Sequence, residues 1–322
     1  MTDTALASTR VTTLATLSTD AQDYLRKSVA DNTKAAHGRD WEHFLMWVAK
    51  ENKKKEPDEK MLIPLPATLE TVAEYLADLA KEGYKYSTIA RRVASISVMH
   101  QIARYDSPTR NPIVRGVLKG IARDSGTAKK QAVPLRLSEI RRVIYRLNDG
   151  LQAKRDRALL LLGWHLAARR SELVDLDVED LEVTEDGMRV TIRHSKTDQT
   201  GRGETFGIPY CGKDESMCAV RAVRDWIDAA GIESGPLLRA VNRHGQVQTG
   251  RLLGRTVERV IQRYSPGCGG HSLRAGFITD QYSIGCPENL IAARSRHRSL
   301  AVMGAYRREA NMFSRDYTDG LL

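Results

Sequence analysis

Two short motifs near the carboxyl terminus hold residue types that can act together on a phosphate. Tyr306 lies nine residues after His297, and His271 and Arg274 form a His-x-x-Arg pair just upstream. A tyrosine hydroxyl attacks a phosphodiester only when bases, acids and guanidinium groups surround the phosphorus. His271 and Arg274 follow two glycines and are expected on one face of a helix, where both can converge on one anion at its N-terminus. The alternatives are a capped surface helix for this pair and a tyrosine that packs by its ring.

Two further cations lie at the ends of expected elements. Arg169 follows an apolar helix directly, at a junction where the scaffold can hold its planar fork for bidentate phosphate binding. Lys196 lies on the turn between two expected strands, from which a lysine can reach a leaving oxygen and donate a proton. The alternatives are a solvated helix start for Arg169 and an exposed turn residue for Lys196.

Amphipathic helices are expected in the first third of the chain, because apolar residues recur there at helical spacing. The stripes are Trp41, Phe44, Leu45 and Val48; then Leu69, Val72, Leu76 and Leu79; then Ile89, Val93, Ile96 and Ile102. Thr68 is expected to cap the second of these helices, and Gly83 to end it in a left-handed conformation. A fourth helix is expected over 114–121.

The rest of the chain mixes helices with a few strands. Helices are expected over 138–147 and 153–166, the second so apolar that it is buried nearly all round. Asp186-Gly187 between alternating segments predicts a hairpin, and a third strand over 205–208 completes a small antiparallel sheet. Further helices are expected over 216–229, 249–264, 271–282, 288–294 and 299–308.

These elements predict a mainly α protein with a small antiparallel β-sheet in the C-terminal domain, an α+β architecture. The polar stretch that begins at Asp124 has no apolar period and marks the boundary between two domains. We expect a helical domain over 15–123, a linker over 124–134 and a second domain over 135–322.

Composition restricts the class of protein. The chain has 322 residues, 41% of them hydrophobic, which is typical of a globular protein with a buried core. A formal net charge of +10 and a pI near 9.5 favour a polyanionic partner such as nucleic acid. Four scattered cysteines fit a reducing cytosol better than a disulfide scaffold, and no apolar run is long enough to cross a membrane. We therefore expect a soluble, cytoplasmic protein.

The order and local context of these residues resemble the catalytic set of the tyrosine recombinases, the phage integrase family, including its Cre-like members. The matching positions are Arg169 in Ala-Arg-x-Ser-Glu-Leu, Lys196 in Ser-Lys-Thr-Asp, His271 and Arg274 in His-x-Leu-Arg, His297 in His-Arg-Ser-Leu, and Tyr306 nine residues later. Glu172 matches the acidic residue that braces the pocket in that family. One position departs from the pattern, because relatives commonly have glycine directly before the second histidine and this chain has Arg296.

The resemblance implies a mechanism of DNA cutting and rejoining. Tyr306 would attack the scissile phosphate and form a 3′-phosphotyrosyl link with a free 5′-hydroxyl. Arg169 and Arg274 would clamp the phosphorane, Lys196 would act as general acid, and His271 and His297 would transfer protons and donate hydrogen bonds. The bond energy of the phosphate is retained, so neither ATP, a metal nor another cofactor is expected.

The resemblance also implies partners. One partner is double-stranded DNA with specific recombination sites. The other is the chain itself, which would form a homotetramer on two paired sites and be a monomer or dimer when free of DNA. The enzyme would be bacterial or carried by a phage or plasmid, as part of a mobile genetic element.

The helical domain would grip DNA from the opposite face, so that the two domains form a clamp. Lys85, Tyr86, Arg91 and Arg92 form a basic and aromatic cluster at the start of the third helical stripe, which suits a phosphate or groove contact. A solvated helix end explains this cluster equally well.

Two rival functions are a type IB topoisomerase, which relaxes supercoils without paired sites, and a DNA-binding protein without catalytic activity.

Overall fold

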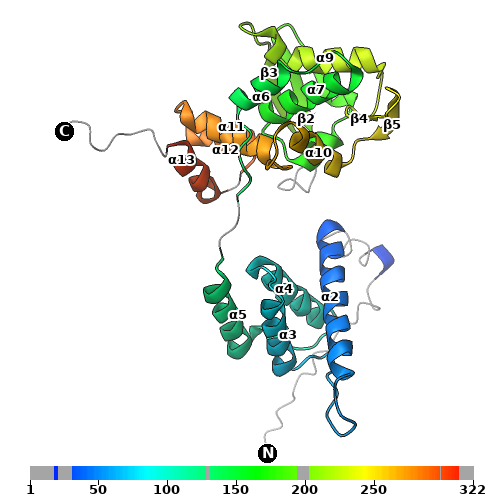
Figure 1. The fold of residues 1–322 in the computed structure, drawn as a ribbon, viewed down its shortest axis with the longest axis vertical. Coiled ribbons are helices and arrows are strands. Elements are labelled where there is room, and N and C mark those ends of the chain that lie inside the picture. The colour runs from blue at the N-terminus through cyan, green and yellow to red at the C-terminus, as the bar shows by residue number, and fades with distance from the viewer. Residues whose placement is uncertain (1–17, 21–30, 128–130, 194–202, 298, 312–322) are drawn as a thin grey trace, which may run out of the picture. The chain divides into compact units, whose positions relative to one another are not determined.

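The computed structural model of this chain describes residues 18–20, 31–127, 131–193, 203–297 and 299–311 (Figure 1). The chain divides into two compact units, Met1–Lys129 and Lys130–Leu322, each with its own hydrophobic core. The division falls inside the polar stretch expected as a linker. Within the described ranges, no helix combines the length and the apolar character that crossing a membrane requires.

The first unit is helical. In chain order its elements are α2 (Asp31–Asn52), α3 (Leu69–Lys81), α4 (Tyr86–Ile102), the 3₁₀ helix η2 (Pro108–Arg110) and α5 (Pro112–Ser125). Phe44, Tyr75 and Leu76 lie fully buried at its centre. The backbone N–H of Thr71 donates to the side chain of Thr68, which confirms the expected cap, and Gly83 has φ +79° just after α3, which confirms the expected stop.

Two of the expected core positions in the first unit are exposed. Leu45 and Ile102 are 37% and 55% exposed, although both fall on the helical stripes. Leu45 adjoins the buried Phe44 on α2, and Ile102 is the last residue of α4. The helical spacing of apolar residues therefore predicted the buried faces of α2 and α4 correctly, but it included one residue on each helix that is exposed.

The second unit consists of helices around two small sheets. Its elements are α6 (Leu137–Ile144), α7 (Leu151–His165), α8 (Arg170–Asp175), η3 (Val178–Asp180), β1 (Leu181–Val183), β2 (Gly187–Ile192), β3 (Glu204–Pro209), η4 (Glu215–Met217), α9 (Ala219–Ala230), β4 (Arg239–Val241), β5 (Val247–Arg251), α10 (Gly254–Tyr264), α11 (Ser272–Ser283), α12 (Glu288–Ser295), η5 (Leu300–Met303) and α13 (Gly304–Ala310). These elements confirm the predicted fold class.

The larger sheet is antiparallel with the order β1-β2-β3, as the hairpin motif predicted. Met188, Val190 and Ile192 alternate along β2 and are buried against the helices. At the first turn, a Cβ atom on Gly187 would lie 2.1 Å from the carbonyl oxygen of Ile208, so only glycine permits this approach of the strands.

The smaller sheet was not expected from the sequence, and the helix expected over 249–264 was wrong at its start, because β5 runs to Arg251 and α10 begins at Gly254. β4 and β5 pair antiparallel around a turn in which the Asn242 side chain accepts hydrogen bonds from the backbone N–H groups of His244 and Gln246. Val241 and Val247 next to the turn are only half-buried. The strands therefore lack the strong apolar alternation by which a hairpin is recognised.

Helix α7 is the central element of the second unit and packs against α9 and α11. Its residues from Ala158 to Leu162 are all buried, which confirms the expectation of burial on every side. A Cβ atom on Gly163 would lie 2.7 Å from the Leu273 side chain, and one on Gly276 would lie 1.8 Å from the Leu135 carbonyl oxygen. Glycines therefore allow α11 to approach both α7 and the segment before α6, which places the start of α11 close to the end of α7.

Candidate active site

Arg169 lies at the junction of α7 and α8, where the chain reverses direction. Ala167, two residues after the end of α7, has a left-handed conformation with φ +46°, and Arg169 is the N-cap of α8. The backbone N–H of Arg169 donates to Oε2 of Glu172 at 2.7 Å, and its guanidinium is ion-paired with Oε1 of the same carboxylate. Glu172 thus holds both the backbone and the side chain of Arg169.

Arg274 reaches the same junction from α11. Its side chain is almost fully buried, and Nη1 donates to the carbonyl oxygen of Ala167 at 3.0 Å. Nη2 lies 3.2 Å from Nδ1 and 3.3 Å from Nε2 of His297. Since a guanidinium only donates, His297 presents at least one unprotonated nitrogen to Arg274.

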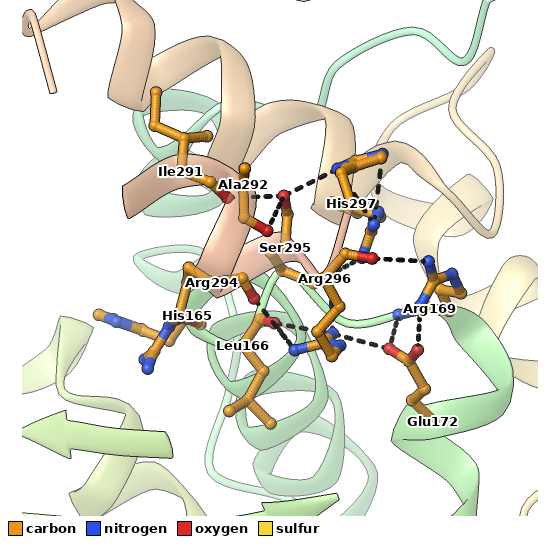
Figure 2. A network of polar contacts seen from close by, with 12 residues as sticks. His165, Leu166, Arg169, Glu172, Ile291, Ala292, Arg294, Ser295, Arg296 and His297 are labelled. Carbon is orange, nitrogen blue, oxygen red and sulfur yellow. Dashed lines mark hydrogen bonds and ion pairs between the residues drawn. The ribbon is translucent and has the colours of Figure 1, made fainter. Parts of the chain in front are cut away.

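His297 follows α12 directly and is held by the preceding turn (Figure 2). Its Nδ1 lies 2.8 Å from Oγ of the buried Ser295, whose Oγ also lies 2.6 Å from the carbonyl oxygen of Ile291. The hydroxyl has one hydrogen, so donation to Ile291 requires Nδ1–H to donate to Ser295, whereas donation to His297 leaves Nε2 to carry the ring proton. Ser295 therefore sets which nitrogen of His297 is available to a substrate.

A third guanidinium, that of Arg296, lies behind the other two. It is 6% exposed, and its Nη2 lies 2.7 Å from Oε2 of Glu172 (Figure 2). The backbone carbonyl of the same residue accepts a hydrogen bond from Nη2 of Arg169 at 3.4 Å. Arg169, Glu172, Arg296 and His297 therefore form one continuous polar network drawn from two distant segments.

The electrostatics of this network favour an anion. Arg169, Arg274 and Arg296 contribute three positive charges and Glu172 one negative charge, which leaves a surplus of two positive charges. Burial, followed by the charges of Arg274, Arg169 and Arg296, lowers the pKa of His297 to about 4. His297 is therefore neutral at physiological pH in the DNA-free protein.

The buried groups respond to the same charges. Burial and the nearby Arg169 and Arg296 guanidiniums lower the pKa of Arg274 to about 9, which keeps it charged at neutral pH. For Glu172, burial acts to raise the pKa, but the charge of Arg296 and the hydrogen bonds from Arg169 outweigh it and the pKa is lowered. Glu172 is therefore an ionised carboxylate despite its burial.

Tyr306 lies on α13, which packs against α11. The residue is half-buried against the core, close enough to Arg274 for its charged form to raise the pKa of that guanidinium. The α11–α13 packing thus brings the tyrosine to the side of the site that Arg274 lines.

The remaining expected site residues differ in position. His271 is the N-cap of α11 and is exposed, one turn before Arg274. Lys196 lies outside the described residues, as does the whole turn over 194–202. Among the residues that the structure describes, no three His, Cys, Asp or Glu side chains gather in a group that could hold a metal ion.

Residues 134–312 match the model of the phage integrase family. The chain belongs to this family. An integrase/recombinase xerD homolog of Selenomonas ruminantium is 34% identical over 312 residues, which cover 92% of this chain and 87% of that protein. Recombinase cre of Escherichia phage P1 is 25% identical over 247 residues, or 68% of this chain and 70% of its own length.

The fold of this recombinase also resembles solved structures. A structure of the XerH site-specific recombinase bound to palindromic difH substrate, in a post-cleavage complex, matches with a TM-score of 0.58 at 15% identity. The match covers 85% of this chain and 76% of that one and shows a shared fold. The family match and the Selenomonas ruminantium relative confirm the predicted class, a tyrosine recombinase that cuts and rejoins DNA.

The basic cluster in the first unit of this recombinase is divided between surface and core. Lys85 and Arg91 are exposed and Tyr86 is half-buried. Arg92 is instead 7% exposed, lies 4.3 Å from the ring centroid of Tyr84 and is ion-paired with a buried aspartate, Asp40. This differs from the expectation of a DNA contact at Arg92, because its guanidinium is committed to the interior of its own unit.

Two residues of the network, Ser295 and Arg296, were not identified as site residues from the sequence. Arg296 stood out only as a departure from the family pattern, and Ser295 carried no signal of its own. Ser295 and Arg296 lie two residues and one residue before His297, and nothing in the sequence indicates that either side chain contacts the site. Their roles depend on the turn after α12, which a sequence pattern does not describe.

Proposed function

We propose that this recombinase cuts and rejoins DNA at specific sites through a 3′-phosphotyrosyl intermediate formed by Tyr306. The carrying observation is that Arg274 contacts both His297 and the Ala167 carbonyl in the turn before Arg169, which brings groups far apart in the sequence to one position with surplus positive charge. Tyr306 lies on the adjoining helix α13. A scissile phosphate in that position would supply the negative charge that the site lacks.

The two arginines act on the phosphate. Arg169 and Arg274 are held by Glu172 and by the Ala167 carbonyl, so their guanidiniums are fixed before DNA binds. Fixed donors stabilise the charge that develops on the non-bridging oxygens without reorganisation, which is worth about 10²–10³ in rate for each donor. Preorganisation of the clamp is therefore the main contribution of the scaffold.

His297 acts as a hydrogen-bond donor to a non-bridging oxygen. In the free protein burial and then the charges of three guanidiniums lower the pKa of His297, and the approaching phosphate cancels part of the effect of those charges. Oγ of Ser295 donates to the Ile291 carbonyl, so Nδ1–H of His297 donates to Ser295 and the unprotonated Nε2 faces Arg274. Nε2 takes up a proton, which it then donates to the substrate, as the phosphate raises the pKa of the ring. Ser295 and Arg274 together thus position the histidine for donation.

The covalent step exchanges one phosphate ester for another. The Tyr306 hydroxyl gives its proton to His271, its oxygen forms a bond to phosphorus, and the bond from phosphorus to the 5′ oxygen breaks. Lys196 protonates the departing 5′ oxygen. Attack by a second 5′-hydroxyl reverses these steps, so rejoining needs no external energy.

The partner is double-stranded DNA that carries recombination sites. The net charge of +10 supports this partner, and Lys85, Tyr86 and Arg91 are accessible for phosphate contacts by the first unit. Exchange of strands requires two duplexes, so we propose that four protomers assemble on two paired sites and that each closes its two units around DNA as a clamp. The enzyme is proposed to act in the cytoplasm of a bacterium, on a mobile element.

The test is the capture of the covalent intermediate. Nicked duplexes made from the DNA that flanks the gene are mixed with the full chain, and the reaction is quenched in detergent and run on a denaturing gel. We expect a protein–DNA adduct with the wild type and with Tyr145→Phe, a matched control at a 63% exposed tyrosine of the same unit, and none with Tyr306→Phe. An adduct that persists in Tyr306→Phe would contradict the proposal.

The same preparation separates the rival functions. Relaxation of a supercoiled plasmid without paired sites would indicate a type IB topoisomerase, and DNA binding without an adduct on any flanking duplex would indicate a binding protein. Recombination of a plasmid that carries two copies of the cleaved site, with loss of activity in Tyr306→Phe, is the result expected here.

A further inference from the structure

Arg296 has a backbone conformation that usually requires glycine. It is the residue after α12 and has φ +55° and ψ +42°, in the left-handed region. Non-glycine residues are uncommon in this region because Cβ crowds the backbone. The side chain of Arg296 makes contacts that glycine at this position could not make.

The side chain of Arg296 is buried against the end of α7. Nη1 and Nη2 each lie 3.1 Å from the carbonyl oxygen of Leu166, and Nη2 lies 3.3 Å from that of Ala167. These two carbonyls belong to the turn that leads directly into Arg169. One guanidinium thus donates to carbonyls at the buried C-terminal end of α7, which have no partner within the helix, and fixes the turn before Arg169.

The same guanidinium reaches the carboxylate that braces Arg169. Its Nη2 lies 2.7 Å from Oε2 of Glu172, which is itself 2% exposed (Figure 2). Its carbon atom Cζ lies 5.0 Å from the ring centroid of Phe206, on β3. Glu172 therefore lies between two guanidiniums, and the one from Arg296 has no access to a substrate because β3 and α7 enclose it.

We propose that Arg296 is a positioning residue of this site. Its guanidinium fixes Glu172 and the turn before Arg169, and its left-handed backbone directs His297 toward Arg274. The inference rests on the proposed function for its kinetic test, but the ion pair with Glu172 can be tested without DNA. Arg296 itself touches neither the phosphate nor the nucleophile.

The kinetic test uses the full chain and a nicked duplex that the wild type cleaves. Arg296→Gly keeps a residue that accepts the left-handed backbone and removes the whole side chain, so rescue by free guanidinium is needed to separate the guanidinium from the apolar stem. The matched control is Arg294→Gln on α12, whose guanidinium binds the carbonyls of His165 and Gly207 but not Glu172. We expect the single-turnover rate of adduct formation to fall about 10- to 100-fold in Arg296→Gly, because small displacements of catalytic groups have effects of this size.

If Arg296 only positions other groups, its loss should lower the rate of adduct formation more than the affinity for the duplex. The Kd for the duplex should change less than the rate in Arg296→Gly, and Arg294→Gln should keep the wild-type rate. Guanidinium chloride at millimolar concentration should restore part of the rate of Arg296→Gly, whereas urea, which has a similar shape and no charge, should not. A wild-type rate in Arg296→Gly, or a loss explained wholly by a weaker Kd, would overturn the inference.

The second test needs no cleavage. Millimolar guanidinium should raise the Tm of Arg296→Gly but not that of the double variant Arg296→Gly with Glu172→Gln, because the carboxylate is then gone. An equal shift, or no shift, in both variants would overturn the inference. If the wild type forms no adduct at all, the proposed function fails, and this comparison still decides whether Glu172 holds the guanidinium.

Discussion

Replacement of Glu172 by glutamine tests whether the site is an electrostatic network. The carboxylate accepts from the backbone N–H of Arg169 and from Nη2 of Arg296 at Oε2, and from the Arg169 guanidinium at Oε1. Glutamine has nearly the same shape but only one acceptor oxygen, so its amide N–H group must face a guanidinium donor. Glu172→Gln therefore leaves two buried cations without their counterion.

The expected loss of stability is large. Removal of one partner from a buried ion pair costs about 3–5 kcal/mol. For a unit of this size the unfolding midpoint falls by about 2–4 °C for each kcal/mol, so the transition of the second unit should fall on the order of 10 °C. The control Glu258→Gln removes an exposed ion pair with Arg170, in which the side chains are 37% and 44% exposed, and should cost less than about 1 kcal/mol.

Scanning calorimetry of the full chain at several pH values is the appropriate assay, because the two units can unfold in separate transitions. The pKa of Glu172 is lowered in the folded state from the 4.5 of a free glutamate. Its stabilising effect is therefore complete above pH 4.5 and is lost as the pH falls through the folded-state pKa. The gap between wild type and Glu172→Gln should narrow in that acidic range. A midpoint equal to that of wild type at pH 7, or a gap that does not change with pH, would refute the reasoning.

Three further predictions concern the clamp, the histidines and the packing. Arg274→Lys keeps the charge but loses the planar fork, so adduct formation should slow by about 10²–10³ while duplex affinity changes less; equal losses in both would count against a transition-state role. The pKa values of His297 and His165 are lowered from 6.5 to about 4, so the unfolded chain takes up protons first and the folded state loses stability as the pH falls from 6.5 toward 4. Nuclear magnetic resonance titration should find both rings neutral at pH 5.5 to 6. Protonation of either ring above pH 6 would disprove this. Gly276→Ala should destabilise the second unit by several kcal/mol, because the new Cβ would lie 1.8 Å from the backbone oxygen of Leu135. The control Gly120→Ala, whose Cβ would have no atom within 4 Å, should stabilise α5 by up to about 1 kcal/mol. If calorimetry ranks the two variants in the opposite order, α11 can shift to make room for the methyl group.

The candidate site shows how far residue patterns reach. Tyr306, Arg169 and Arg274 were identified from residue type, spacing and family resemblance, and the structure brings Arg274 close to both other residues. Arg92 shows the limit of the same reasoning, because a basic residue next to aromatic residues on a helix can face either DNA or the core. Only its neighbours Asp40 and Tyr84, from another helix and from the segment before α4, decide that it is buried.

The sequence by itself determined the family, the mainly α class, the larger hairpin and the residue types of the site, since these depend on local spacing and on short motifs. The tertiary structure alone decided the role of Arg296, whose contact with Glu172 joins residues 124 positions apart. It also decided the β4–β5 hairpin and the interior position of Arg92. These features depend on a left-handed backbone and on long-range burial, and neither a helical period nor a local motif carries information about which distant group a charged side chain will meet.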